Sequence, residues 1–182
     1  MIDREGRIVA HSAVMPGSPK HYLAKLLTGN LEFCHSSAML RKSFLEEKNL
    51  SYREDCPGLE DYCFYMEASR VGKISCLADV HIHRRLSGDG VSNDSLREFT
   101  AERARLFNGI RCDSLRMSGV RLSKQEECLL GQLLPEDRLP VWNRQEREQL
   151  TNLFSEIRSQ LVAGGFAAIG ELDEILFSIL NH

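Results

Sequence analysis

Apolar residues recur at helical spacing through the second half of the chain. Leu150, Leu153 and Phe154 lie three and four positions apart, and Leu172 and Ile175 repeat the spacing further on. A helix places residues with these separations on one face. The pattern therefore predicts amphipathic helices, whose apolar stripes serve packing in most globular proteins.

Start and stop signals support two of these helices. Ser123 is followed three residues later by Glu126, and Asn143 by Glu146. Each pair predicts a capping box, in which the two residues satisfy each other's free backbone amides. Gly164, with a second glycine after it, predicts the end of the helix that begins near Asn143.

The first half mixes short apolar runs with glycine and proline. Residues 4–7 predict a hairpin turn in which Gly6 takes a positive φ angle. Residues 59–71 predict a helix that Gly72 closes. Short strands are expected over residues 34–40, 73–77 and 80–84. The predicted fold class is α+β and mostly helical, with a partial α/β unit over residues 1–92 and a helical extension over residues 93–182.

Composition narrows the class of protein. The 182 residues carry a formal net charge of -3, which argues against a large nucleic-acid-binding surface. None of the six cysteines forms a Cys-x-x-Cys pair, and the opening residues are too polar for a secretory signal. We therefore expect reduced cysteines and a cytoplasmic protein, with peripheral association at the inner face of a membrane left open.

Glu60 and Asp61 open the predicted helix over residues 59–71, ahead of an aromatic run. The helix dipole favours acids in a first turn by about 0.3–1 kcal/mol each, so a solvated helix start is one interpretation. The other is a catalytic base, because a half-buried carboxylate beside aromatic rings suits proton transfer. The sequence pattern leaves both open.

His81 and His83 would share one face of the predicted strand over residues 80–84, a spacing that can bind a metal. Two ligands do not complete a site, so they are weak metal candidates, with a structural or solvent-exposed pair as the alternative. The chain contains no glycine-rich phosphate loop of the Walker or dinucleotide type and no Asp-x-Asp.

Five segments, in order along the chain, resemble family-2 glycosyltransferases of the GT-A fold. Residues 35–41 resemble the family's segment of small residues, Met and Arg, and residues 50–54 its Gly-Tyr-Asp-Glu turn. Residues 60–62 resemble its Glu-Asp motif at a helix start. Residues 72–80 resemble the strand pair that follows in the family. Residues 83–92 resemble its arginine loop. The helical extension is similar, more weakly, to that of many bacterial polysaccharide transferases.

The resemblance implies an inverting transfer of a sugar from a nucleotide-diphosphate donor to a glycan or other hydroxyl acceptor. Asp61 would be the base, and Glu60 would bind the acceptor or orient the base. Arg84 and Arg85 would contact the donor diphosphate. The remaining substrate-binding candidates are His35, Met39, Arg41 and Tyr62. Tyr62 and Tyr65 suit stacking on a sugar, with core packing as the alternative.

The chain departs from the family's pattern in three ways. Glu67 stands where the family usually has Arg, and Leu86 where its loop has His. The donor-binding half with its Asp-x-Asp, which holds a divalent metal (Mn or Mg) in the full-length enzyme, is not in this sequence. The chain thus resembles the acceptor half, which we expect to be inactive alone.

Such a half would leave sheet edges unpaired, which favours a homo-oligomer.

Two further hypotheses belong to other functional classes. One is a non-catalytic helical interaction module derived from a glycosyltransferase. The other is a small metal-binding protein, which has less support because no ligand spacing closes a four-coordinate site.

Overall fold

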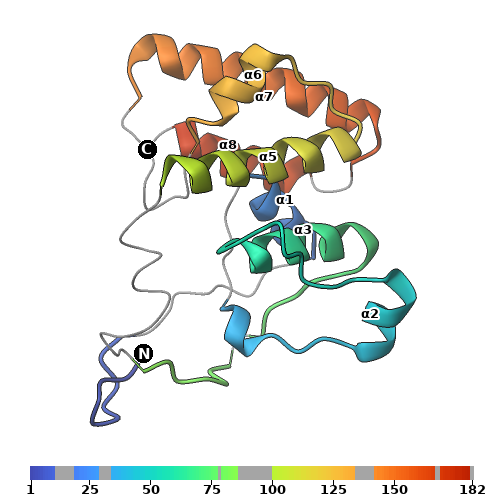
Figure 1. The fold of residues 1–182 in the computed structure, drawn as a ribbon. Helices are drawn as coiled ribbons and strands as arrows, with labels where there is room; N and C mark the ends of the chain where they lie inside the picture. The colour runs from blue at the N-terminus through green and yellow to red at the C-terminus, as the bar shows by residue number, and fades with distance from the viewer. Residues whose placement is uncertain are drawn as a thin grey trace.

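A computed structural model describes residues 1–10, 19–28, 34–77, 79–85, 100–133, 142–166 and 169–180. Helix dominates this part of the chain, as the apolar periodicity predicts (Figure 1). The elements in order are α1 (Pro19–Thr28), the 3-10 turn η1 (His35–Ser37), α2 (Lys42–Lys48), α3 (Glu60–Val71), α5 (Ala101–Met117), α6 (Lys124–Leu130), α7 (Arg144–Ala163) and α8 (Ile169–Leu180).

The strands predicted in the first half are wrong. Residues 34–40 contain η1 instead, and residues 73–77 and 80–84 have no regular secondary structure. Across the described residues β pairing is limited to two isolated bridges, from Ile2 to Ile8 and from Ile2 to Arg85. A strand needs a neighbour along its length to pair its backbone groups, and here only Ile2 supplies one. The predicted turn at Gly6 is confirmed, with φ at 87°.

The predicted capping boxes are confirmed at α6 and α7. Ser123 accepts from the backbone N–H of Glu126, and Asn143 accepts from that of Glu146, with both glutamates bonding back. Helix α3 has no such cap, because its N-cap residue is Leu59. The sequence patterns missed α2, whose Phe44 ring packs so closely on Gly72 that a Cβ there would lie 2.5 Å from it.

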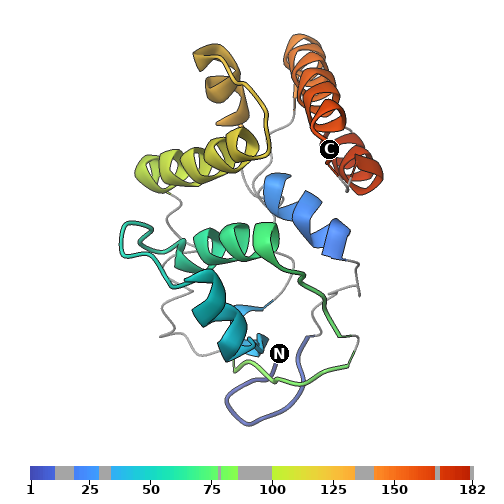
Figure 2. The same ribbon diagram turned by 90° about the vertical axis from the view of Figure 1, so that its right-hand side faces the viewer.

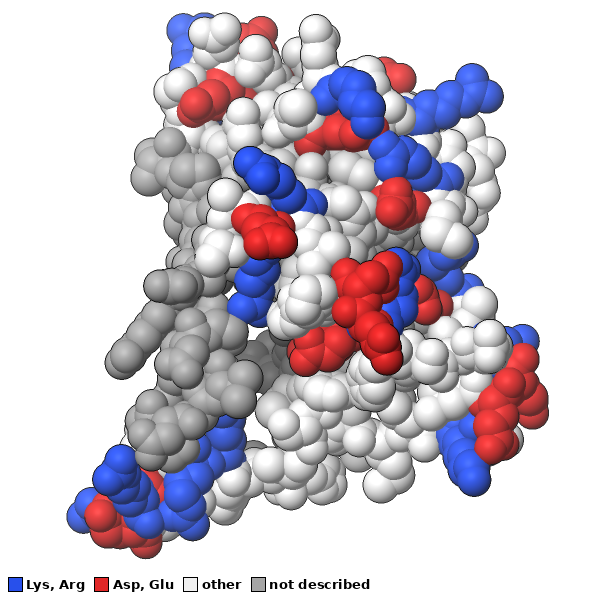
Figure 3. Space-filling model, in the orientation of Figure 1, with Lys and Arg blue, Asp and Glu red and all other residues white. Residues whose placement is uncertain are grey.

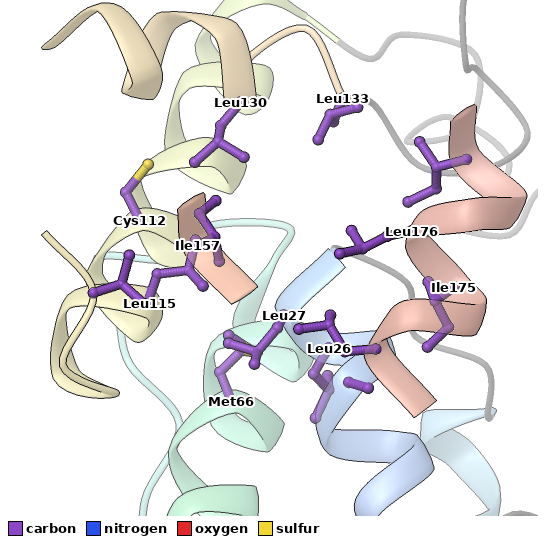
Figure 4. Close-up of a cluster of buried hydrophobic side chains, with 14 of the residues drawn as sticks. Leu26, Leu27, Met66, Cys112, Leu115, Leu130, Leu133, Ile157, Ile175 and Leu176 are labelled. Carbon is purple, nitrogen blue, oxygen red and sulfur yellow. The ribbon is translucent and has the colours of Figure 1, made fainter. Parts of the chain in front are cut away.

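Helix α1 lies between α3 and the layer that holds α5 and α8 (Figures 1 and 2). It buries Ala24, Leu26 and Leu27. Side chains from α1, α3, α5, α6, α7 and α8 meet in one hydrophobic core (Figure 4). The domain boundary predicted near residue 93 lies outside the described residues, and helices from both sides of it share this core.

A buried cation, Arg111 of α5, crosses this core and is only 1% exposed. Its Nη1 and Nη2 donate to the carbonyls of Leu130 and Leu133 at 2.8 and 2.6 Å, at the C-terminal end of α6. The guanidinium carbon lies 4.8 Å from the ring centroid of Phe107. Burial lowers the pKa of Arg111. This side chain therefore joins α5 to α6, beside a cavity of about 20 Å³.

Among the helices described, none is both long and apolar enough to cross a membrane.

Replacing Arg111 by Met should lower the free energy of unfolding by about 1–3 kcal/mol, because two buried carbonyls would lose their donors. Chemical denaturation measures this. Arg105→Met is the matched control, since Arg105 is exposed on the same helix, and it should change stability by less than about 0.5 kcal/mol. Equal stability of the two variants would contradict the structural role of Arg111.

Candidate functional site

Glu60 and Asp61 occupy the first two positions of α3. Asp61 is half-buried and Glu60 is exposed. The Oδ1 of Asp61 accepts a hydrogen bond from the backbone N–H of Tyr62 at 2.7 Å. This bond partly replaces the cap that Leu59 cannot provide, and it holds the Asp61 carboxylate at the helix start.

A chain of three polar rings lies next to these acids. The hydroxyl of Tyr65 lies 3.0 Å from Nδ1 of His35, and the hydroxyl of Tyr52 lies 3.3 Å from Nε2 of the same ring. Tyr52 also stacks on Phe64, with centroids 4.8 Å apart, and remains 47% exposed. Three segments of the resemblance, 35–41, 50–54 and the start of α3, therefore come together in space.

Helix geometry explains why Asp61 belongs to this group. Asp61 and Tyr65 are four residues apart in α3, so their side chains are neighbours on its surface. The pKa of Tyr65 is raised to about 12, mainly by burial, with smaller contributions from neighbouring groups that include Tyr52 and Asp61. Burial also raises the pKa of Tyr52, with additional contributions from Asp61 and Glu60. Both phenols thus experience the negative charge at the start of α3.

Tyr62 does not belong to this group, and its assignment to substrate binding is wrong. Its side chain is 3% exposed, and its hydroxyl donates to the backbone carbonyl of Leu26 in α1 at 2.8 Å. Its ring stacks on Phe107 of α5, with centroids 4.8 Å apart. The core-packing alternative holds for Tyr62, because this position of α3 faces the other helices.

Two further candidates lie in the segment between η1 and α2. Met39 is 97% exposed, and Arg41 is the exposed N-cap residue of α2. Among the contacts described for this segment, none links either side chain to the rings around His35. Arg41 and Met39 are available to solvent but are not part of the ring cluster.

Arg84 and Arg85 lie at the N-terminal hairpin. The backbone N–H of Ile2 donates to the carbonyl of Arg84 at 2.9 Å, and Nη1 of Arg85 donates to the carbonyls of Asp3 and Arg4 at 2.9 and 2.7 Å. Figure 3 shows the charged corner that this hairpin forms, at the lower left of the molecule. Arg85 thus fixes the hairpin to the segment that follows α3.

His81 and His83 are exposed in the same segment. Without the predicted strand, no sheet face aligns their rings. Within the described ranges, no group of three or more His, Cys, Asp or Glu side chains is placed to hold a metal ion.

The structure contains two ion pairs and one disulfide that the sequence patterns did not predict. Arg53 forms ion pairs with Asp55 at 2.6 Å and with Glu67 of α3 at 3.2 Å. Cys56 and Cys63 form a disulfide, so the expectation of six reduced cysteines is wrong for this pair. The turn at Pro57 and Gly58, where φ of Gly58 is 70°, brings the first cysteine back to the helix. The turn residues Pro57 and Gly58 were the signal in the sequence from which this disulfide could have been predicted.

The remaining cysteines, at positions 34, 76, 112 and 128, are free thiols.

Comparisons with known proteins add no assignment, since no protein-family model, curated protein or solved structure matches this chain.

The pKa values of Tyr62 and Tyr65, raised to about 12 by burial, predict an alkaline transition. The folded chain holds these phenolic protons more tightly than the unfolded chain, whose tyrosines titrate near 10. Their contribution to stability is therefore complete below about pH 10 and is lost as the pH rises towards about 12. Phenolate absorbance should show that Tyr62 and Tyr65 are among the late-ionising members of the four tyrosines.

Tyr65→Phe should remove one late ionisation and leave that of Tyr62 in place. Ionisation of both residues near pH 10 in the folded protein would contradict their burial.

Proposed function

We propose that this chain is the acceptor-binding and base-carrying part of an inverting glycosyltransferase. Such an enzyme transfers a sugar from a nucleotide-diphosphate donor to a glycan or other hydroxyl acceptor. The observation that carries the proposal is the convergence of His35, Tyr52 and Asp61, which come from three separate segments of the resemblance. Activity requires a donor-binding half in addition to this chain.

Asp61 is the base in this proposal. Its carboxylate takes the proton of the acceptor hydroxyl as that oxygen attacks the anomeric carbon, and the nucleoside diphosphate leaves from the opposite face. The helix dipole favours the ionised carboxylate that this step needs. Glu60, exposed beside it, is placed to accept a hydrogen bond from a neighbouring acceptor hydroxyl.

Tyr52 offers a surface on which a sugar can stack. One face of its ring is covered by Phe64, while 47% of the residue remains exposed. Sugars present apolar C–H faces, which pack on aromatic rings, and hydroxyls, which bond to carboxylates. An exposed ring close to Asp61 and Glu60 combines both kinds of contact.

Arg53 also differs from the family's pattern, in addition to the three departures given above, and its charge is complementary to that of Glu67. Arg53 stands where the family's turn has Asp, and Glu67 stands where its helix usually has Arg. The two side chains form an ion pair at 3.2 Å. Since each reversal meets its opposite, the pair is compatible with a turn and helix arranged as in the family.

A divalent metal in such an enzyme stabilises the departing diphosphate. Among the described residues of this chain, no group of three or more His, Cys, Asp or Glu side chains is placed to hold it. Its ligands belong to the donor-binding half.

Asp61→Asn should lower the turnover number at least about a hundredfold, because the amide cannot accept the proton. The assay uses a longer polypeptide that joins this chain to a donor-binding half, with a panel of nucleotide sugars. Glu47→Gln, which alters an exposed acid on α2, is the control and should leave turnover unchanged. Near-normal turnover of Asp61→Asn would mean that Glu60 and Asp61 form only a solvated helix start. Absence of turnover in the unsubstituted joined polypeptide would favour the non-catalytic interaction module.

Tyr52→Ala should raise KM for the acceptor by about threefold to tenfold with little change in kcat, because stacking contributes to binding. Phe177→Ala is the matched control, because Phe177 is also an exposed aromatic residue but lies on α8. Saturation-transfer NMR of this chain with mono- and disaccharides measures the same loss without donor. Equal sugar contact by both variants would remove Tyr52 from the site.

A further inference from the structure

The start of α3 is closed by the disulfide between Cys56 and Cys63, which are seven residues apart. The loop that it encloses contains Glu60 and Asp61. Both cysteines are buried, at 1% and 2% exposure. The residues between them include exposed Pro57 and Gly58, so the crosslink joins the core to a surface turn.

Besides the disulfide, the buried side chain of Leu59 and several hydrogen bonds hold this turn. The backbone N–H of Leu59 donates to the carbonyl of Cys56 at 3.0 Å, and Nη2 of Arg103 in α5 donates to the carbonyl of Gly58 at 2.6 Å. The N-cap residue Leu59 contributes no side-chain bond. By contrast, α5, α6 and α7 each begin with a side chain that accepts from the backbone. The disulfide thus supplies much of the constraint that a cap would give.

We propose that Cys56 and Cys63 form a redox switch that orders the start of α3 when oxidised and releases it when reduced. A dithiol reductant breaks the sulfur–sulfur bond: two electrons and two protons pass to the cysteines, and the reductant becomes a disulfide. Reduction removes the crosslink that restricts the loop. An uncapped helix start frays more readily than a capped one, so the released turn opens.

The switch changes the position of the candidate site without changing its residues. Asp61 and Glu60 are inside the loop, whereas His35 and Tyr52 are outside it and stay with their own segments. Reduction therefore separates the carboxylates from the rings. The ordering itself does not depend on the proposed function; only its effect on sugar transfer does.

Hydrogen exchange of the full chain tests this proposal. One sample is oxidised with glutathione disulfide and the other reduced with dithiothreitol. The oxidised sample should contain four titratable thiols under denaturing conditions, which is six cysteines less the two in the disulfide. Upon reduction, amides over residues 57–66 should exchange at least about tenfold faster, while α7 remains unchanged.

Two variants separate the switch from other thiol effects. The double variant Cys56→Ser, Cys63→Ser should exchange like the reduced chain in both conditions. Cys34→Ser with Cys128→Ser removes the two exposed free thiols and should keep the full response. If the first variant does not fold, the comparison of the two wild-type samples still decides.

Three results would overturn the proposal: six free thiols after oxidation, unchanged exchange at residues 57–66, or an equal rise of exchange in α7. The last result would make the disulfide a general stabiliser. Loss of the response in the variant that lacks Cys34 and Cys128 would assign it to those thiols instead. None of these readouts uses sugar transfer, so an inactive chain leaves the test intact.

Discussion

The packing of α3 against α1 and α5 is the constraint on which the candidate site depends. Tyr62 determines how α3 is rotated, because its hydroxyl bonds to the carbonyl of Leu26 and its ring stacks on Phe107. With the side chain of Tyr62 directed into the core, the side chain of Asp61 lies at the edge of the buried face of α3. The half-buried position of Asp61 beside Tyr65 follows from this rotation.

This arrangement accounts for the different surroundings of two adjacent residues. The proposed base, Asp61, needs contact with substrate, whereas the core side chain of Tyr62 is shielded from it. Neighbouring positions on a helix are separated by about 100° of rotation, so Asp61 reaches the surface while Tyr62 is enclosed. Phe107 contacts both Tyr62 and Arg111, so the buried Arg111 belongs to the same core.

Features set by local sequence could be predicted, and those that need a distant partner could not. The capping boxes at Ser123 and Asn143 depend on residues three positions apart, and both are present. The strand expected over residues 80–84 needed a neighbouring strand, but within the described ranges the bridging there is limited to Ile2 and Arg85. In the candidate site, the sequence identified Asp61, Glu60 and His35. It missed Tyr52 and the ion pair between Arg53 and Glu67, because their partners are brought close only by the fold. It also missed the Cys56–Cys63 disulfide, for which the turn residues Pro57 and Gly58 were a local signal.

The central position of α1 has a consequence for how the chain is made. Its apolar residues face α8, which lies about 150 positions later in the sequence. During synthesis on the ribosome, α1 emerges long before the helix that covers it. The part of its apolar face that packs on α8 must stay exposed, or be shielded by a chaperone, until residues 169–180 have been synthesised. Such distant contacts also slow folding, because a long loop has to close before they form.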